Sequence, residues 1–469
     1  MDGRNGVRRR LVAAWVIPGV AFLMVACGSS PEIAMPDVPD GVRGVAVDTD
    51  MGLDDALALL FLASRPDVQL RAVTVVGDGL AHCDPGVRNA RAILSLTGQG
   101  DVPVACGGRR PLLGSNAFPD EWRETADDLY GLDPPAAAGT APAISAPELL
   151  RQALDGDTAL LTLGPYTNVA LALRQDPGLA GRVPTVISMA GAVDVPGNAP
   201  NGVAEYNVWA DPLAAKEVLA AMPVTLVPLD ATNAVPLTTF FVDALGRHSG
   251  TRAADAAHEL IADDPFLVSG SYFFWDPLAA GLLVEPRLGT YETRRLLVTA
   301  SRDAGAGWID DYDAGPEVRV ATRADGLAFE RTFLSALAGE RVADVRPAPD
   351  LEFAFDGARC EPSVPSGLRS GSAVVVFRNA SQQGAVLILL RFGADVTYQD
   401  LVDAVGAPGS LVTEGPAGFR FLGQADAPAG GDAWIAVELK GPNVAAACAI
   451  PEGDAARVWL GGWFTLGPR

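Results

Sequence analysis

Short apolar runs alternate with helical segments along the first part of the chain, and this alternation predicts the fold. The apolar runs predict buried strands at 44–47, 70–76, 159–163, 185–189, 224–228 and 295–298. Helical segments are expected between them, at 56–62, 86–96, 168–173 and 212–221. Such an order is typical of an α/β fold with a mostly parallel, Rossmann-like sheet that helices cover on both faces. We expect this domain to span residues 41–346.

The pattern changes after Arg346-Pro347-Ala348-Pro349, where a boundary is predicted. Strand-like runs separated by Gly, Pro and Asn follow at 373–378, 385–390, 433–439, 445–450 and 458–465. Several short strands with turn residues between them are typical of a β-sandwich. We therefore expect a smaller all-β sandwich domain over residues 350–469.

The N-terminus has the pattern of an export signal. Arg4, Arg8, Arg9 and Arg10 precede an apolar segment at 11–26, which is short for a membrane-spanning helix. The segment ends in Val25-Ala26-Cys27 and resembles a bacterial lipoprotein signal, in which Cys27 would become the lipidated first residue. We expect a signal with its lipidated Cys at 1–27 and a linker at 28–40. The protein would be exported, and either lipid-anchored to the outer face of the bacterial cytoplasmic membrane or periplasmic; an uncleaved anchor is the alternative.

Charge and cysteine content narrow the classes further. The net charge of −22 argues against a nucleic-acid partner, because phosphate binding needs clusters of Lys and Arg. Besides Cys27, the chain has Cys83, Cys106, Cys360 and Cys448. An exported protein permits disulfides, and an even number of thiols allows two, but the sequence leaves their pairing open.

The candidate chemistry begins with four carboxylates within residues 48–55, between a predicted strand and a predicted helix. This position is the carboxyl end of the predicted strand, where open α/β sheets bind their ligands. Gly52 is expected to supply the positive φ of a tight turn. So many neighbouring carboxylates remain ionised only beside a cation, and Ca²⁺ or Mg²⁺ prefers such oxygen ligands. The alternative is an acidic helix cap, which would explain Asp54 and Asp55 but not Asp48 and Asp50.

The motif Asp48-Thr49-Asp50-x-Gly52-x-Asp54-Asp55 resembles the signature of the nucleoside hydrolases. Later segments resemble that family's motifs in the same order over about 300 residues, namely Leu163-Gly164-Pro165-Tyr166-Thr167-Asn168, Met189-Ala190-Gly191, Gly197-Asn198, Ala204-Glu205-Tyr206-Asn207, Asp211-Pro212 and Trp275-Asp276-Pro277. The resemblance implies that side chains of Asp50, Asp55 and Asp276 and the backbone carbonyl of Leu163 hold Ca²⁺. It also implies that Asp50 is the general base for a metal-activated water.

The same resemblance implies the residues that bind the sugar. Asp54, Asn198, Glu205 and Asn207 would contact the ribose hydroxyls, since buried hydroxyls need polar partners. These hydrogen bonds can strengthen as the ribose approaches an oxocarbenium ion. Asp48 would orient the metal ligands.

The leaving-group side resembles the purine-specific branch of the family. Trp275 occupies the position where many members have His, and Trp122 lies in a segment similar to that branch, where two Trp side chains sandwich the base. Asp78 would hydrogen-bond a purine nitrogen. Stacking favours a protonated, electron-poor purine, which can leave without a dedicated general acid. The alternative is that both Trp side chains belong to the core.

The C-terminal segment resembles cupredoxin-like domains through Phe377-Arg378-Asn379, the segment at 398–402 and the strand that carries Cys448. No His follows His258, so a blue-copper site would lack its imidazole ligands. We expect a structural or binding domain, in which Cys360 and Cys448 are the natural disulfide pair and free thiols are the alternative.

These expectations combine into a Ca²⁺-dependent enzyme that hydrolyses the N-glycosidic bond of purine ribonucleosides to free base and ribose. A purine nucleoside would be its substrate, and the resemblance implies that the protein forms a homo-oligomer. Two alternatives stay open. The first is a surface lipoprotein that binds nucleosides or ribosyl compounds without turnover, and the second is a protein whose C-terminal domain docks a surface partner.

Overall fold

The computed structural model describes residues 32–138, 140–268, 272–365, 368–413, 418–453 and 455–466. The predicted signal and Cys27 lie outside the described residues. Within those ranges, every helix is too short or too polar to cross a bilayer.

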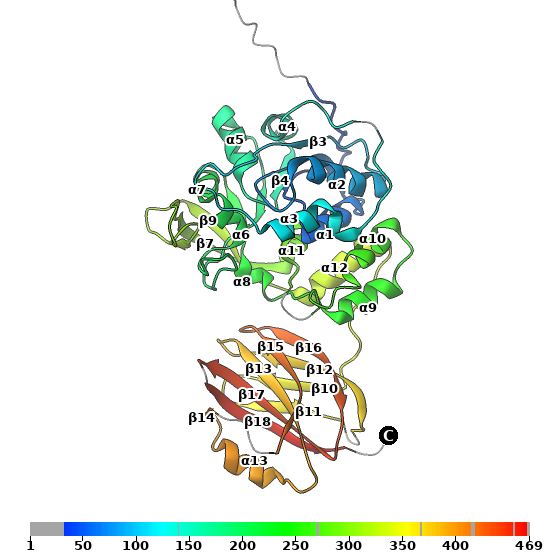
Figure 1. Ribbon diagram of the computed structural model, residues 1–469, viewed down its shortest axis with the longest axis vertical. Coiled ribbons are helices and arrows are strands. Elements are labelled where there is room, and N and C mark those ends of the chain that lie inside the picture. Colours follow the sequence, from blue (N-terminus) through cyan, green and yellow to red (C-terminus); the bar gives the residue numbers. More distant parts are fainter. Residues whose placement is uncertain are drawn as a thin grey trace, which may run out of the picture. The chain divides into compact units, whose positions relative to one another are not determined.

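A nine-stranded sheet forms the centre of the first domain, in the order β3-β2-β1-β4-β5-β6-β9-β7-β8 (Figure 1). The strands from β3 to β9 in this order run parallel, and β7 and β8 add an antiparallel edge. The predicted α/β fold with a mostly parallel sheet is therefore confirmed. The strands are β1 Arg43–Thr49, β2 Val68–Val75, β3 Val104–Cys106, β4 Thr158–Thr162, β5 Val186–Met189, β6 Val224–Val227, β7 Gly289–Val298, β8 Ile309–Asp311 and β9 Glu317–Ala324.

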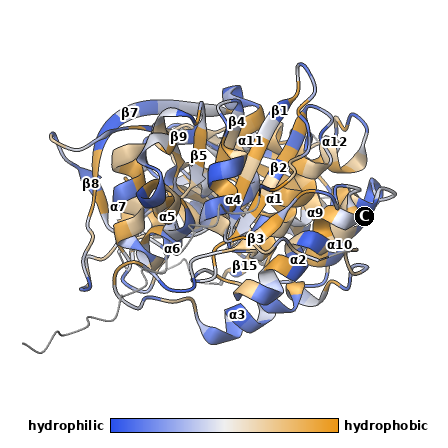
Figure 2. Ribbon diagram, turned by 90° about the horizontal axis from the view of Figure 1, so that it is seen from above, coloured by the Kyte–Doolittle hydropathy of each residue, from blue (hydrophilic) through white to orange (hydrophobic). Residues whose placement is uncertain are grey.

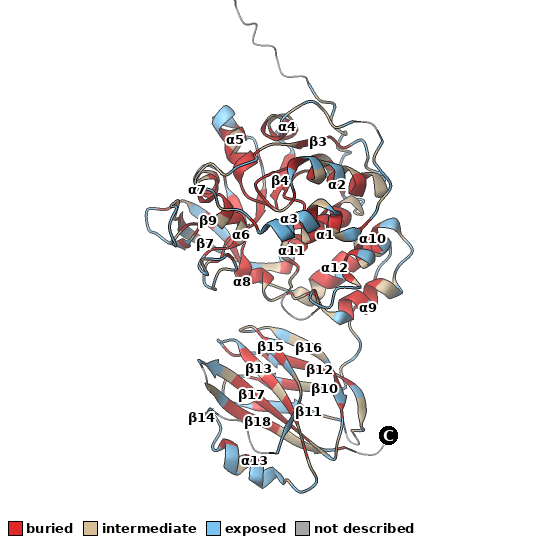
Figure 3. Cartoon of the chain, viewed as in Figure 1, coloured by how far each residue is buried: buried red, intermediate tan, exposed pale blue. Residues whose placement is uncertain are grey.

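Helices cover both faces of the sheet and enclose two hydrophobic cores. Side chains alternate along β1, so Val45 and Val47 enter one core and Ala46 enters the other. The first core includes α1 Leu53–Ala63, α2 Cys83–Leu96, α9 Thr239–Arg247, α10 Arg252–Ile261, α11 Trp275–Val284 and α12 Gly326–Ala338. The second includes α4 Ala146–Ala153, α5 Thr167–Gln175, α6 Tyr206–Ala210 and α7 Pro212–Ala221. Figure 3 shows that the visible parts of these helices are largely buried.

The elements begin earlier than apolar periodicity predicts wherever their first turn is polar. Helix α1 begins at Leu53 and so includes Asp54 and Asp55, and α2 begins at Cys83. The predicted strand at 295–298 is the end of the longer antiparallel strand β7. The helix α3 Asp120–Asp127 was not predicted, and Figure 2 shows why, because it is largely hydrophilic while α1 and α11 are largely hydrophobic.

The C-terminal domain consists of two packed sheets, β11-β10-β12-β16 and β14-β18-β17-β13-β15. Its strands are β10 Leu351–Phe355, β11 Cys360–Ser363, β12 Gly371–Asn379, β13 Ala385–Phe392, β14 Ser410–Val412, β15 Arg420–Ala427, β16 Asp432–Leu439, β17 Asn443–Glu452 and β18 Ala455–Thr465, with one helix, α13 Tyr398–Val405, among the described residues. Phe353, Phe355 and Phe377 are fully buried in the core between the sheets. The predicted Cys360–Cys448 disulfide is present. The all-β prediction is confirmed, and the cupredoxin-like assignment stays a prediction.

Candidate active site

A cavity of about 490 Å³ opens at the carboxyl ends of the parallel strands. It contains all but one of the side chains that the sequence predicted for the metal, the general base, the sugar and the base. Those that line it are Asp50, Asp54, Asp55, Trp122, Leu163, Asn198, Glu205, Asn207, Trp275 and Asp276, and Asp78 is the exception. Segments more than two hundred residues apart therefore meet in one site.

Three carboxylates gather at the acidic end of this cavity. Asp54 and Asp55, on the first turn of α1, lie with Asp276 on α11, and each offers an oxygen within 4.8 Å of the others. Asp55 and Asp276 are 1% and 2% exposed, so they have almost no water to solvate their charge. Hard oxygen donors this close together fit a divalent cation of the Ca²⁺ or Mg²⁺ type.

Asp50 lies beside this cluster and is held tightly. Its Oδ2 accepts the Leu80 amide at 3.0 Å. Gly79 and Gly164 pack against it, because a Cβ on either would come within 2.2 Å and 2.9 Å of the Asp50 Cβ. The orientation of the predicted general base is therefore fixed by the backbone of two neighbouring segments.

The turn between β1 and α1 differs from the expectation for Gly52. Met51 has the positive φ of 58°, and Gly52 has an ordinary φ of −66°. Gly52 is required for space instead, since a Cβ there would lie 2.7 Å from Leu80 Cδ1. Its amide donates to Asp55 Oδ2 at 2.8 Å. The cap interpretation is thus correct for Asp55, which caps α1 and also faces the acidic cluster.

Without a cation, burial and mutual repulsion disfavour the ionised form of these acids. Burial first, and then the Asp55 charge, raise the pKa of Asp54 to about 7 and those of Asp50 and Asp276 well above the usual range. Burial also raises the pKa of Glu205 to about 7, although three backbone amides donate to it. A bound cation would reverse these shifts, because it favours the ionised form.

The predicted sugar-binding residues lie next to the acids and are oriented by the backbone. Asn207 donates to the carbonyl of Leu163 at 3.0 Å and to that of Met189 at 3.1 Å. Asn198 Oδ1 accepts the Tyr206 amide at 3.1 Å. The Leu163 carbonyl predicted to hold the metal therefore lies at the cavity, at the end of β4.

Aromatic side chains line the same cavity as the acids. Trp122 is 49% exposed and tilts against Tyr206, with ring centroids 5.5 Å apart. Tyr206 also stacks on Phe118 at 4.7 Å. Trp275 meets Tyr272 edge to face at 4.8 Å. The two predicted Trp side chains thus belong to a larger aromatic wall of the cavity, and Trp275 also packs against the first hydrophobic core, so the core interpretation is correct in part for Trp275.

Two predicted acids are turned away from the cavity and form buried polar networks. Asp78 Oδ2 contacts the Thr167 hydroxyl at 2.7 Å, and the same hydroxyl contacts Asp211 Oδ2 at 2.8 Å. One hydroxyl proton cannot serve two carboxylates, so one of these acids is protonated, and burial raises the pKa of Asp78 to about 7. Asp48 accepts Thr74 at 2.6 Å and Asn168 at 2.8 Å, as expected for a residue that supports the site from behind.

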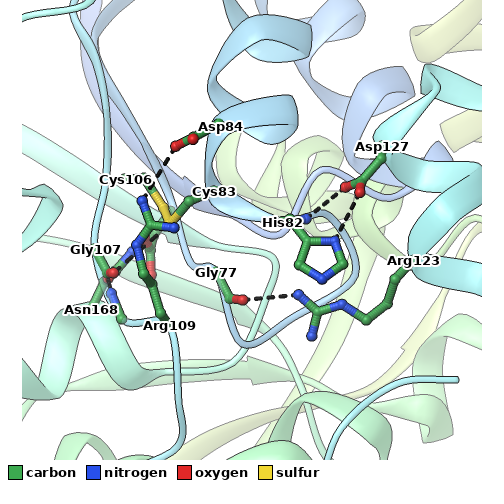
Figure 4. The surroundings of a disulfide bond; sticks show 12 residues. Gly77, His82, Cys83, Asp84, Cys106, Gly107, Arg109, Arg123, Asp127 and Asn168 are labelled. Atoms are coloured by element: carbon green, nitrogen blue, oxygen red, sulfur yellow. Dashed lines mark hydrogen bonds and ion pairs between the residues drawn. A yellow bond between two sulfur atoms is a disulfide. The ribbon is translucent and has the colours of Figure 1, made fainter. Parts of the chain in front are cut away.

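A second disulfide, Cys83–Cys106, lies beside the loop that holds Asp50 (Figure 4). It joins the first residue of α2 to the last residue of β3. A Cβ on Gly77 would lie 2.6 Å from Cys83 Sγ, and the Arg123 guanidinium donates to the Gly77 carbonyl at 2.9 Å. The loop from Gly77 to Leu80 is therefore fixed at both ends.

Sequence reasoning missed two tyrosines in the cavity. Tyr272 hydrogen-bonds Asp54, and the Tyr130 hydroxyl lies close to the same acids. Tyr130 belongs to a turn with unusual backbone angles, which composition and periodicity do not reveal. A better signal was the aromatic run at 272–275, which leads into α11 and includes both Tyr272 and Trp275.

Fold and site together define an α/β protein with a buried acidic cluster, suited to a hard cation, beside an aromatic-walled cavity. Comparison with known proteins gives the family. Residues 45–331 match the family model described as "Inosine-uridine preferring nucleoside hydrolase". This match covers more than half of the chain, which therefore belongs to the inosine-uridine preferring nucleoside hydrolase family. The predicted family and enzyme class are confirmed for the α/β domain.

Individual relatives agree on the family and differ in their substrates. An uncharacterized protein of Schizosaccharomyces pombe is 33% identical over 40% of this chain and 62% of its own length. The pyrimidine-specific ribonucleoside hydrolase RihA of Enterobacter is 31% identical over 52% of this chain and 80% of its own. The solved structure of a purine-preferring ribonucleoside hydrolase from Gardnerella vaginalis has a TM-score of 0.56 at 26% identity, over 63% of this chain and 98% of that one.

Proposed function

We propose that this chain is a Ca²⁺-dependent enzyme that hydrolyses purine ribonucleosides to free base and ribose. The observation that carries the proposal is one cavity that is lined both by buried carboxylates and by stacked aromatic rings. A ribose would lie against the acids and a base against the rings. The purine-preferring neighbour is compatible with this substrate, and the pyrimidine-specific relatives make it the part that most needs a test.

The chain's own residues have separable roles in this proposal. Asp50, Asp55, Asp276 and the Leu163 carbonyl would hold the cation, with Asp54 close enough to share in it. A bound cation of this kind lowers the pKa of a coordinated water toward neutrality. Asp50 would take the proton of the attacking water, and the Leu80 amide keeps its carboxylate in one orientation.

The aromatic wall supports a purine as leaving group. Among the described residues, the cavity lining contains no His. His82 instead pairs with Asp127 at 2.8 Å, outside it. A base that leaves without an imidazole acid must be basic enough to take a proton from solvent, and stacking on Trp122 and Trp275 would stabilise a protonated purine. A pyrimidine, with less ring surface and lower basicity, gains less from such a site.

The test is release of reducing sugar from inosine, adenosine, guanosine, uridine and cytidine, with added Ca²⁺ and with chelator. We expect chelator-sensitive turnover of the purine nucleosides and its loss in Asp50→Ala. Turnover of uridine and cytidine at equal rates would keep the hydrolase and reject the purine preference. Binding of nucleosides without any turnover would instead favour a non-catalytic binding protein.

We also propose that the protein is exported and lipid-anchored through Cys27. The support is the signal-like sequence, together with two disulfides in the described residues, which an oxidising compartment permits. Detergent phase partitioning of the protein expressed in a bacterial host would test it, with Cys27→Ser as the variant expected to leave the detergent phase. The homo-oligomer is proposed from the family resemblance alone, and light scattering of the purified residues 31–469 would test it.

A further inference from the structure

A strained turn delivers one side chain to the acidic end of the cavity. Residues Leu129–Gly131 have φ values of 49°, 55° and 84° in succession, all in the left-handed region. Only Gly131 accepts this region freely, whereas Leu129 and Tyr130 are bulky L-residues that rarely adopt it. Such strain persists where surrounding structure imposes it, and it concentrates at functional sites. The strained turn therefore points to a function for Tyr130 at this position.

The hydroxyl of Tyr130 is placed where it can donate its proton. Tyr130 lines the cavity, and its hydroxyl lies close to the Leu53 amide at the start of α1. Asp54, the residue after Leu53, has the strongest charge effect of the three acids that lie near this hydroxyl. Because the oxygen lies beside an amide donor, the O–H proton is available for donation, next to the carboxylate of Asp54.

Hydrogen-bond donors are scarce at this end of the cavity. Asn207 uses both amide hydrogens on the carbonyls of Leu163 and Met189. The Tyr272 hydroxyl is engaged by Asp54, and Glu205 is an acceptor of three backbone amides. A sugar hydroxyl both donates and accepts, so a site made of carboxylates satisfies only half of it. Tyr130, the amide of Asn198 and the Trp275 indole N–H, which is buried without a hydrogen-bond partner, are neutral donors in the cavity lining that could supply the other half.

We propose that Tyr130 is a sugar-binding residue, whose hydroxyl donates to a ribose hydroxyl that in turn donates to Asp54. The inference rests on the proposed nucleoside substrate and adds a residue that selects for the 2′,3′-diol. The left-handed turn is the means by which a residue on the loop after α3 reaches the first turn of α1.

Tyr130→Phe tests the role, because it keeps the ring and removes the hydroxyl. For adenosine we expect kcat/KM to fall about ten-fold, the effect of one lost hydrogen bond to a buried partner. With 2′-, 3′- and 5′-deoxyadenosine, the loss should disappear for the 2′- or the 3′-deoxy substrate and persist for the 5′-deoxy one. A loss of equal size on all four substrates would overturn the inference.

Tyr291→Phe is the matched control, since its hydroxyl donates to the Pro286 carbonyl at 2.9 Å away from the cavity. It should leave the substrate pattern unchanged. If Tyr130 only caps α1, its Phe variant would lower the melting temperature as this control does and show no preference among the deoxy substrates.

Calorimetric binding of D-ribose separates this inference from the proposed function. Wild type should bind ribose about ten-fold more tightly than Tyr130→Phe. Equal affinities in an enzyme that hydrolyses adenosine would overturn the role of Tyr130 and leave the hydrolase intact. Weaker ribose binding by the variant of a chain that turns over no nucleoside would support Tyr130 while the proposed function fails.

Discussion

The two domains bury different kinds of polar side chain. In the α/β domain, Asp50, Asp55 and Asp276 are at most 2% exposed at the carboxyl ends of the strands, without a cation partner among the described side chains in contact with them. In the described part of the C-terminal domain, the buried polar side chains are Asn379 and Ser381. Asn379 donates to three backbone carbonyls, so the hydrogen bonds of a turn account for it.

This difference separates residues kept for function from residues kept for folding. Buried carboxylates that repel one another destabilise a fold unless something else neutralises them, whereas a satisfied Asn in a turn costs little. The α/β domain therefore carries a destabilising feature, which a bound cation would offset. The C-terminal domain carries none that we find in its described residues, which fits a structural or binding role.

The largest expected effect is the loss of one clustered acid. Asp276→Ala removes a carboxylate from the proposed cation site, and kcat/KM should fall about a thousandfold or more, because several kcal/mol of charge stabilisation depend on that site. Nucleoside hydrolysis and Ca²⁺ titration calorimetry measure both consequences. Asp426→Ala, an exposed acid on β15, is the control and should change neither. Unchanged activity of Asp276→Ala would break the comparison between the domains.

The buried acids of the α/β domain should also make the stability of the protein depend on pH. Because the folded pKa of Asp54 and Glu205 is raised to about 7, the folded chain binds more protons than the unfolded chain between about pH 4 and 7. Stability in chelator should therefore fall as pH rises through 7, by about 5 °C or more in melting temperature from pH 5 to pH 8. Added Ca²⁺ should reduce that fall, because it favours the ionised acids. Identical pH profiles with chelator and with Ca²⁺ would argue against a cation at the cluster.

The two disulfides allow a matched comparison of the domains. Replacing both Cys83 and Cys106 by Ala should loosen the loop that presents Leu80 to Asp50 and lower kcat/KM about ten-fold. The same double replacement at Cys360 and Cys448 should destabilise the C-terminal domain by about 2–4 kcal/mol and leave kcat/KM unchanged. Calorimetric melting and nucleoside hydrolysis distinguish them. Equal losses of activity in both variants would mean that the domains are functionally coupled.

The smallest expected effect comes from removing the C-terminal domain. A chain that ends at Pro349 keeps Arg346, which pairs with the buried Glu330 through its Nε and Nη2 atoms. Hydrolysis by this chain should stay within about two-fold of the full chain, since every cavity-lining residue precedes the cut. A loss of activity with the α/β domain still folded by circular dichroism would favour the alternative in which the C-terminal domain carries the function.

The sequence by itself determined the features that depend on local pattern. Apolar periodicity located the strands and helices that form the cores, and the spacing of Asp48, Asp50, Asp54 and Asp55 placed acids on a strand-to-helix turn. Local preferences fix such elements because each involves neighbours a few residues apart. The order of six further motifs then identified the family and most of the predicted site residues.

Only the tertiary structure decided which way the polar side chains point. Asp78 turns to Thr167, 89 residues away in the sequence, instead of to the cavity. Asp54 joins Asp55 and Asp276 in the closest cluster, whereas Asp50 was the predicted ligand. Met51, and not Gly52, has left-handed backbone angles, and Tyr130 has them too although it is not a glycine. In each case the side chain follows partners that folding brings together from distant segments, and no local pattern encodes those partners.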